Sequence, residues 1–250
     1  MARPRDPLAR SALVAAARKE FVRVGIQRAR IEDITNASSL SKGAFYLHFE
    51  SKEALFRELV VEFEAQFEKI RAAREFSYIQ LLSAGLPERK DPGPFVESLL
   101  ALEGQNDRKV LELFWEWREV TDVLLRGAQG TEFENVFWAL LDREIARVEV
   151  ETEVLMRAGL IREDLPERAL GPIVVGTYLM IARRMSTLPV KPDIDQLVNS
   201  LQSVLADGVS SKSLRAQRDR GASPPPARPR AASELPTPVA SASSGKRRRS

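Results

Sequence analysis

Apolar residues recur every three to four positions along most of this chain. Leu13, Ala17, Phe21 and Val24 fall on one face of a helix over residues 7–24. No segment alternates apolar and polar residues as a half-buried strand does. The sequence therefore predicts an all-α fold. The same spacing predicts further helices over residues 31–37, 41–47, a longer stretch from Ser51, 94–104, 107–127, 131–158, 166–186 and 193–208.

Residues with a preference for helix ends divide these segments. Asp6, Ser41 and Ser51 each precede a helical pattern, where a side-chain oxygen can accept a hydrogen bond from a free backbone amide. Gly25 is a candidate stop for the first helix, since glycine adopts the left-handed conformation at little cost. Pro172 predicts a kink or a late start in its helix, because proline cannot donate a backbone hydrogen bond.

Charge is distributed unevenly along the chain. Residues 1–60 hold 11 Lys and Arg against 7 Asp and Glu, residues 61–209 hold 17 against 26, and residues 210–250 hold 10 against 2. A basic start, an acidic middle and a basic end indicate three separate roles, and the two basic parts are candidates for binding anions.

The charge distribution and the helical spacing of apolar residues together divide the chain into three regions. We predict a three-helix unit over residues 7–50 (the head), a helical domain over 51–209 (the body) and a Pro- and Ser-rich tail over 210–250. The tail has too little apolar surface to offset the entropy of ordering, so we predict that it is disordered. Extra, sequence-independent affinity for DNA through its KRRR run is an alternative role.

The residue inventory excludes several classes of function. The chain has no cysteine and one histidine, His48, which excludes disulfides, thiol catalysis, cysteine-ligated zinc and a histidine-rich metal site. Without a nucleophile–base pair we expect no enzyme activity, and we expect neither a cofactor nor a metal. The longest apolar run, 173–182, is too short to span a bilayer, and the first residues do not resemble a signal peptide. We therefore expect a cytoplasmic protein with no membrane partner.

Residues 31–47 have the layout of a helix-turn-helix. IEDITNA forms the first helix, Ser38, Ser39 and Leu40 lie in the turn, and Ser41 caps the second helix. In such motifs the second helix enters the major groove of DNA. Gly43 lies in the first turn of that helix, although glycine costs about 1 kcal/mol in a helix interior. A missing side chain there would let the backbone approach a duplex closely.

Cationic and hydroxyl groups surround this second helix. Lys42 and Tyr46 are four residues apart and share a face, so both can reach the phosphate backbone. Ser51 and Lys52 form a second helix start with a lysine beside it, which suits a phosphate. Arg28 precedes the first helix of the motif and can contact the backbone on the other side.

The stretches LVAAARKEFVRVG and IEDITNASSLSKGAFYLHFESKEALF resemble the TetR-type bacterial transcriptional repressors over about residues 12–60. The resemblance implies that Lys42, Gly43, Tyr46, His48 and Lys52 face or support the DNA. This sequence departs from the family pattern at Ser39, which replaces a turn glycine and predicts either a slightly strained turn or a different turn. It also departs at Arg30, Ala44 and Leu47, which bear on the operator sequence. The predicted DNA-binding set is Arg28, Arg30, Ser41, Lys42, Gly43, Ala44, Tyr46, Leu47, His48 and Lys52.

In the body, the resemblance implies a ligand pocket between helices and a homodimer. The pocket would take an unknown small-molecule effector, and the last two long helices would pair with their copies, with Gly176 permitting close approach. Core packing is the alternative reading for each aromatic side chain of the body. The predicted ligand-binding residues are Phe114, Trp117, Arg118, Trp138 and Tyr178.

The function that we expect is that of a ligand-responsive, homodimeric repressor that binds double-stranded operator DNA. An enzyme is a poor alternative, because the carboxylate pairs of the body read as solvated helix faces. A helical protein-interaction module, or a small-molecule-binding protein without specific DNA readout, is the remaining alternative. A steep dependence of DNA binding on salt would distinguish the repressor from the interaction module.

Overall fold

The computed structural model describes residues 6–85, 92–162, 164–166 and 168–210. In these ranges every regular element is a helix, apart from one isolated bridge between Ile161 and Ser210. The predicted all-α fold is confirmed. Apart from Ser210, the predicted tail lies outside the described residues.

The head consists of α1 (Pro7–Arg28), α2 (Ile31–Ala37) and α3 (Lys42–His48). The three predicted caps are confirmed: Asp6 accepts a hydrogen bond from the Leu8 amide, Ser41 from Ala44 and Ser51 from Ala54, at 2.9 to 3.1 Å. At Gly25 the backbone turns to φ +78°, which interrupts α1 where the sequence predicts its end.

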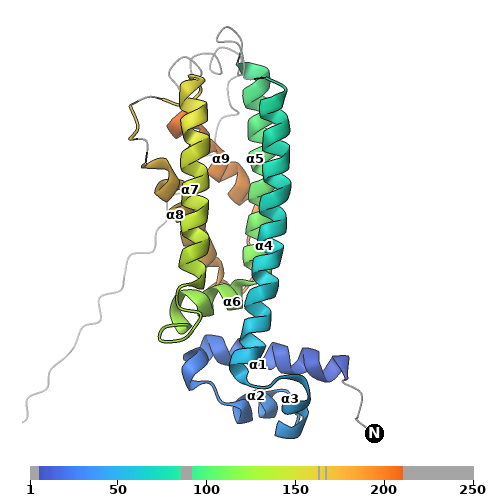
Figure 1. Ribbon diagram of the computed structural model, residues 1–250. Helices are drawn as coiled ribbons and strands as arrows, with labels where there is room; N and C mark the ends of the chain where they lie inside the picture. The colour runs from blue at the N-terminus through green and yellow to red at the C-terminus, as the bar shows by residue number, and fades with distance from the viewer. Residues whose placement is uncertain (1–5, 86–91, 163, 167, 211–250) are drawn as a thin grey trace, which may run out of the picture.

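The body begins with α4 (Lys52–Ser83), which leaves the head and runs the length of the molecule (Figure 1). The remaining elements are α5 (Gly93–Glu116), α6 (Arg118–Asp122), the π-helical turn η1 (Val123–Gly127), α7 (Val136–Arg157), α8 (Leu170–Met185) and α9 (Ile194–Val209). Figure 1 shows α4, α5 and α7 along the long axis, with α6 at the end that meets the head.

Several helix boundaries differ from the sequence prediction, and α7, for example, begins at Val136 rather than at residue 131. The segments 94–104 and 107–127, predicted as two helices, form one helix as far as Glu116, and the break comes instead at Trp117. Gly104 stays within α5, and a Cβ there would meet the side chain of Gln202 at 2.6 Å, so the glycine admits the neighbouring helix α9. Pro172 produces the late start that was one of its two predicted effects, since α8 begins at Leu170.

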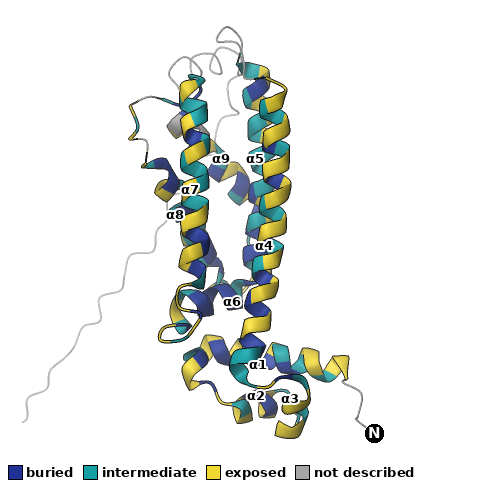
Figure 2. Ribbon diagram, viewed as in Figure 1, coloured by how far each residue is buried: buried dark blue, intermediate teal, exposed yellow. Residues whose placement is uncertain are grey.

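One apolar core continues from the head into the body, and buried positions line the inner faces of the helices (Figure 2). Phe56 at the start of α4 joins the two parts, because its ring meets Phe21 of α1 edge-on at 5.3 Å and Phe133 before α7 at 5.0 Å. The orientation of the head is thus fixed partly by aromatic packing.

The head also touches the body through two glycines. A Cβ on Gly25 would lie 3.2 Å from the carbonyl oxygen of Gly127, so the backbones of α1 and η1 meet with no side chain between them. Polar contacts flank this joint. The Gln27 amide donates to the Gly130 carbonyl at 2.9 Å, and Arg18 pairs with Glu119 at 3.0 Å.

Candidate DNA-binding surface and ligand cavity

The angle between α2 and α3 is set by buried apolar side chains. Phe45 is completely buried in the head core with Ile34, and Leu40 packs against that core from the turn. Ser39 adopts φ +57°, the only positive φ of a non-glycine residue in the described chain, which is the strained turn that was one of its two predicted alternatives. Burying one face of α3 leaves the opposite face to solvent.

The outer face of α3 carries the predicted recognition residues. Tyr46 is 57% exposed and Leu47 48%, and Ser41, Lys42 and Gly43 are exposed beside them. A Cβ on Gly43 would meet only the Ser41 hydroxyl oxygen, at 3.7 Å, which is an ordinary contact. Packing within the described residues therefore gives no reason for glycine at this position.

Two lysines have different surroundings. Lys42 forms an ion pair with Glu32 of α2, and the hydrogen bond from Lys42 lowers the pKa of that carboxyl. Because both side chains are about half exposed, the pair contributes little to stability. Lys52 instead donates to the carbonyl oxygens of Gln27 and Ala29 at 2.8 Å each, and so ties the start of α4 to the end of α1.

The other predicted DNA-binding residues lie at the edge of this surface. Arg28 and Arg30 are exposed on either side of the α1–α2 junction. Ala44 and His48 are half-buried on α3. The His48 ring lies against Phe49, and its Nδ1 is buried without a hydrogen-bond partner in the described chain, which is consistent with a packing role.

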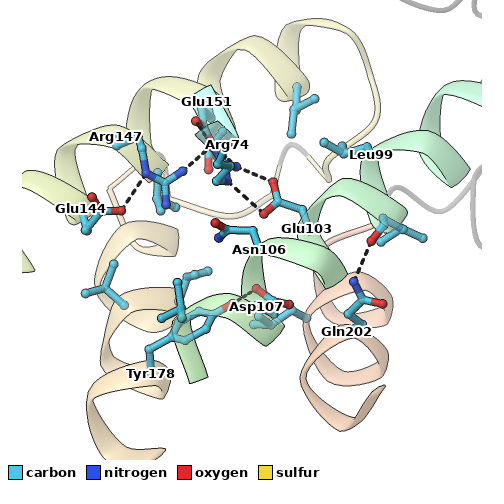
Figure 3. Close-up of a pocket in the computed structure, with 18 of the residues that line it drawn as sticks. Arg74, Leu99, Glu103, Asn106, Asp107, Glu144, Arg147, Glu151, Tyr178 and Gln202 are labelled. Carbon is cyan, nitrogen blue, oxygen red and sulfur yellow. Dashed lines mark hydrogen bonds and ion pairs between the residues drawn. The ribbon is translucent and has the colours of Figure 1, made fainter. Parts of the chain in front are cut away.

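In the body, a cavity of about 260 Å³ lies among α4, α5, α7, α8 and α9 (Figure 3). Its walls are mainly apolar. Phe67, Val110, Phe114, Leu140 and Val175 are among the side chains that line it. Concave apolar sites with a few polar groups are typical of small-molecule sites.

Charged side chains form a network on one wall of the cavity (Figure 3). Arg74 is buried and binds two carboxylates, with 3.2 Å between its Nε and Glu103 and 2.7 Å between Nη1 and Glu151. Burial lowers the pKa of this guanidinium, but the hydrogen bonds and charges of Glu151 and Glu103 outweigh that effect and raise it. Arg147 pairs with Glu144 at 2.8 Å and with Glu151 at 2.9 Å.

Asp107 lies apart from this network, with Tyr178 as its hydrogen-bond partner. The phenol donates to the carboxylate, which is 4% exposed. Burial raises the pKa of Asp107 to about 6, and the hydrogen bond from Tyr178 offsets only part of that shift. Burial and the charge of Asp107 raise the pKa of Tyr178 in turn. The carboxylate of Asp107 is thus mainly ionised at neutral pH, and among the described residues no lysine or arginine forms an ion pair with it.

Comparison with known proteins identifies the head. Residues 13–59 match the family described as "Bacterial regulatory proteins, tetR family". The chain is 36% identical over 61 residues to the uncharacterized HTH-type transcriptional regulator YdgC of Bacillus subtilis. The family match thus covers most of the head and the first turns of α4. The match with YdgC covers 24% of this chain and 31% of that relative, so it spans about a third of the relative's length.

Solved structures resemble most of this chain in fold. KstR2, a ketosteroid transcriptional regulator of Mycobacterium tuberculosis, superimposes with a TM-score of 0.59 at 18% identity, over 81% of this chain and 95% of its own. A TetR-like transcriptional regulator from Rhodococcus sp. RHA1 gives 0.55 at 19% identity, over 82% and 100%. At such identities the likeness concerns the fold alone.

The five predicted ligand-binding residues occupy different places in this chain. Phe114 and Tyr178 line the cavity. Trp117 is buried nearer the head, where its Nε1 donates to Gln66 at 3.3 Å. Arg118 stacks over Trp115 at 4.3 Å, and Trp138 is 49% exposed on α7. The last three do not line the cavity.

Sequence reasoning missed the charged residues of the cavity. Arg74 did leave a signal, since it lies on the buried stripe of α4 formed by Phe63, Phe67 and Tyr78. A charged residue at such a position is rarely buried unless it is paired. Asp107 left no comparable signal, because α5 carries many charged residues. Among the described residues, no group of three or more His, Asp or Glu side chains could hold a metal ion, and no helix could cross a membrane.

Proposed function

We propose that this protein is a TetR-family, homodimeric, ligand-responsive repressor that acts in the cytoplasm, binds operator DNA through α3 and catalyses no reaction. The exposed edge of α3 carries this proposal. Tyr46 and Lys42 lie on that edge, and Gly43 between them has no partner in the fold that requires a glycine. Backbone, phenol and ammonium groups at the start of a recognition helix suit phosphates and base edges in a major groove.

The dimer is proposed from the outer face of α8. Ile173 is 51% and Met180 59% exposed there, and together with Pro172 and Thr177 they line a shallow depression. A Cβ on Gly176 would meet nothing within 4 Å, so a second helix could approach this point closely. A symmetric pair of such faces would hold two heads about one helical turn of DNA apart.

Ligand response is proposed from the path of α4. This helix starts beside the head, where Lys52 is bonded to the end of α1, and passes the cavity at Phe67 and Arg74. A ligand that shifts α4 would change the placement of the head. Binding of ligand and of operator would then oppose each other.

Selection of genomic DNA fragments on the purified full-length protein tests this function. We expect recovery of a short, two-fold symmetric sequence. Lys42→Ala and Tyr46→Ala should each weaken binding to it by roughly tenfold, while Lys69→Ala, which removes an exposed lysine of α4, should not. Binding that is indifferent to salt and to both α3 substitutions would favour a helical interaction module instead.

A further inference from the structure

We propose that the body cavity takes amphipathic organic cations, whose ammonium group lies beside Asp107 and whose apolar part contacts the rest of the wall. This inference rests on the proposed function, since it names the chemical class of the effector. Three observations support it: the balance of charges around the cavity, the occupation of its arginines, and the absence of a cationic partner for its most buried carboxylate.

Carboxylates outnumber guanidinium groups around the cavity. Among the described lining residues, two are cationic and four are anionic. The cations are Arg74 and Arg147, and the anions are Glu103, Asp107, Glu144 and Glu151. A surplus of negative charge in a site of low dielectric attracts cations and repels anions more strongly than it would in water.

Neither arginine is available to an anionic ligand. Arg74 has a 5% exposed side chain and is bound on two sides by Glu103 and Glu151. Arg147 is bound by Glu144 and again by Glu151. A carboxylate or phosphate ligand would have to displace a glutamate from a paired guanidinium, and removing one partner from a buried ion pair is costly.

Asp107 is the carboxylate that lacks a countercharge. Its hydrogen-bond partner is a neutral phenol, and no described lysine or arginine lies within ion-pair distance of it. Figure 3 shows Asp107 on α5 beside Asn106 and facing Tyr178, away from Arg74 and Arg147. A buried anion without a cation is unfavourable in the empty protein. A ligand cation would remove this cost, so Asp107 favours ligands of that charge.

The remaining wall determines the rest of the ligand. Phe67 and Phe114 lie with ring centroids 6.5 Å apart, and Val110, Leu140 and Leu141 continue the apolar lining. Burial of an alkyl or aryl group against this wall would supply most of the binding free energy. The charged group of the ligand would then determine which of several ligands with the same apolar part binds most tightly.

Isothermal titration calorimetry on the full chain at pH 7.5 tests the proposal with three probes that share one apolar chain. The probes are octyltrimethylammonium, octanoate and octanol. We expect the ammonium to bind roughly tenfold or more tightly than octanoate. Asp107→Asn should remove most of that preference and leave octanol binding unchanged. Asp142→Asn, the same change at an exposed site of α7, should leave all three affinities as they are.

Asparagine at position 107 retains an oxygen that can accept the Tyr178 hydrogen bond, so this variant is expected to fold. Failure of octyltrimethylammonium to bind the wild-type protein, binding of octanoate at least as tight, or an unchanged preference in Asp107→Asn would each overturn the inference. Operator binding without ligand reports on the proposed function separately. A protein that binds its operator and is released by octanoate would be a ligand-responsive repressor with a different effector class.

Discussion

The hydroxyl of Tyr178 on α8 donates a hydrogen bond to the carboxylate of Asp107 on α5, inside the body and away from solvent. The bond joins two walls of the cavity. It also pairs an anion with a neutral donor, so the charge of Asp107 remains uncompensated. This arrangement costs stability above the pKa of Asp107, and the cost can be measured.

Asp107→Asn should stabilise the protein at neutral pH. The folded state raises the pKa of Asp107 from 3.8 to about 6, so the native protein binds more protons than the unfolded chain between these values, and stability falls as pH rises through this window. The charged groups nearby are Glu103, Arg74 and Arg147. At pH 7.5 the variant should gain up to about 3 kcal/mol in free energy of unfolding.

The gain in free energy of unfolding of Asp107→Asn over the wild-type protein should be about 2 kcal/mol smaller at pH 4.5 than at pH 7.5. At pH 4.5 much of the native Asp107 is already protonated, so the wild-type protein no longer buries its charge. Urea unfolding at both pH values measures it, with Asp142→Asn as the control for loss of an exposed carboxylate. A stability difference that grows as the pH falls would contradict the assigned environment of Asp107.

Gly43→Ala should separate stability from DNA binding. Alanine in place of an exposed helical glycine should stabilise the head by up to about 1 kcal/mol, because a Cβ meets only the Ser41 hydroxyl oxygen at 3.7 Å. The same methyl group would hold the backbone of α3 away from the duplex. The melting temperature should therefore rise, while the affinity for operator DNA, measured by fluorescence anisotropy, should fall. Unchanged operator affinity would show that Gly43 does not approach DNA.

Ser39→Gly should raise the melting temperature. Serine at φ +57° is held in a left-handed conformation that costs a non-glycine residue about 1 kcal/mol, and glycine adopts it without that cost. Ser39→Ala keeps the backbone penalty and serves as the control, which should show no gain. Equal melting temperatures for the two variants would argue against strain at this turn.

Charge placed on the outer face of α8 should dissociate the proposed dimer. Met180→Glu puts a carboxylate on the apolar face that also carries Ile173, and two copies would bring like charges together across a symmetric interface. Sedimentation velocity should then show a monomer. Val61→Glu changes a similarly exposed apolar residue, 58% exposed on α4, and should leave the dimer intact. Dissociation by Val61→Glu alone would place the interface elsewhere.

The helices and their caps could be predicted from the sequence because they depend on local chemistry. Ser41 and Ser51 cap helices through hydrogen bonds to amides three residues away, so residue type and spacing sufficed. The helix break predicted near residue 105 was wrong, since Gly104 lies inside α5. The glycine at this position leaves space for the side chain of Gln202 on α9. Such contacts between distant segments are not encoded in local spacing.

The dependence on local pattern also explains which residues of the cavity could be predicted from the sequence. Tyr178 and Phe114 were predicted as aromatic residues on apolar helix faces, and both line it. The partner of Tyr178 was not predicted, because Asp107 is 71 residues away and meets it only through the packing of α5 against α8. Trp138 has the same aromatic character, yet it is about half exposed on α7 and does not line the cavity.

The meeting of Gly25 and Gly127 has a consequence for protein engineering. Because two bare backbones touch there, neither partner can adjust by choosing another rotamer. Consider a chimera in which the head of a relative replaces the head of this protein. The angle between head and body will be kept only if η1 of the body leaves room for the segment of the new head that corresponds to Gly25. Exchange of operator specificity should therefore succeed more often when residues 123–127 are transplanted together with the first fifty.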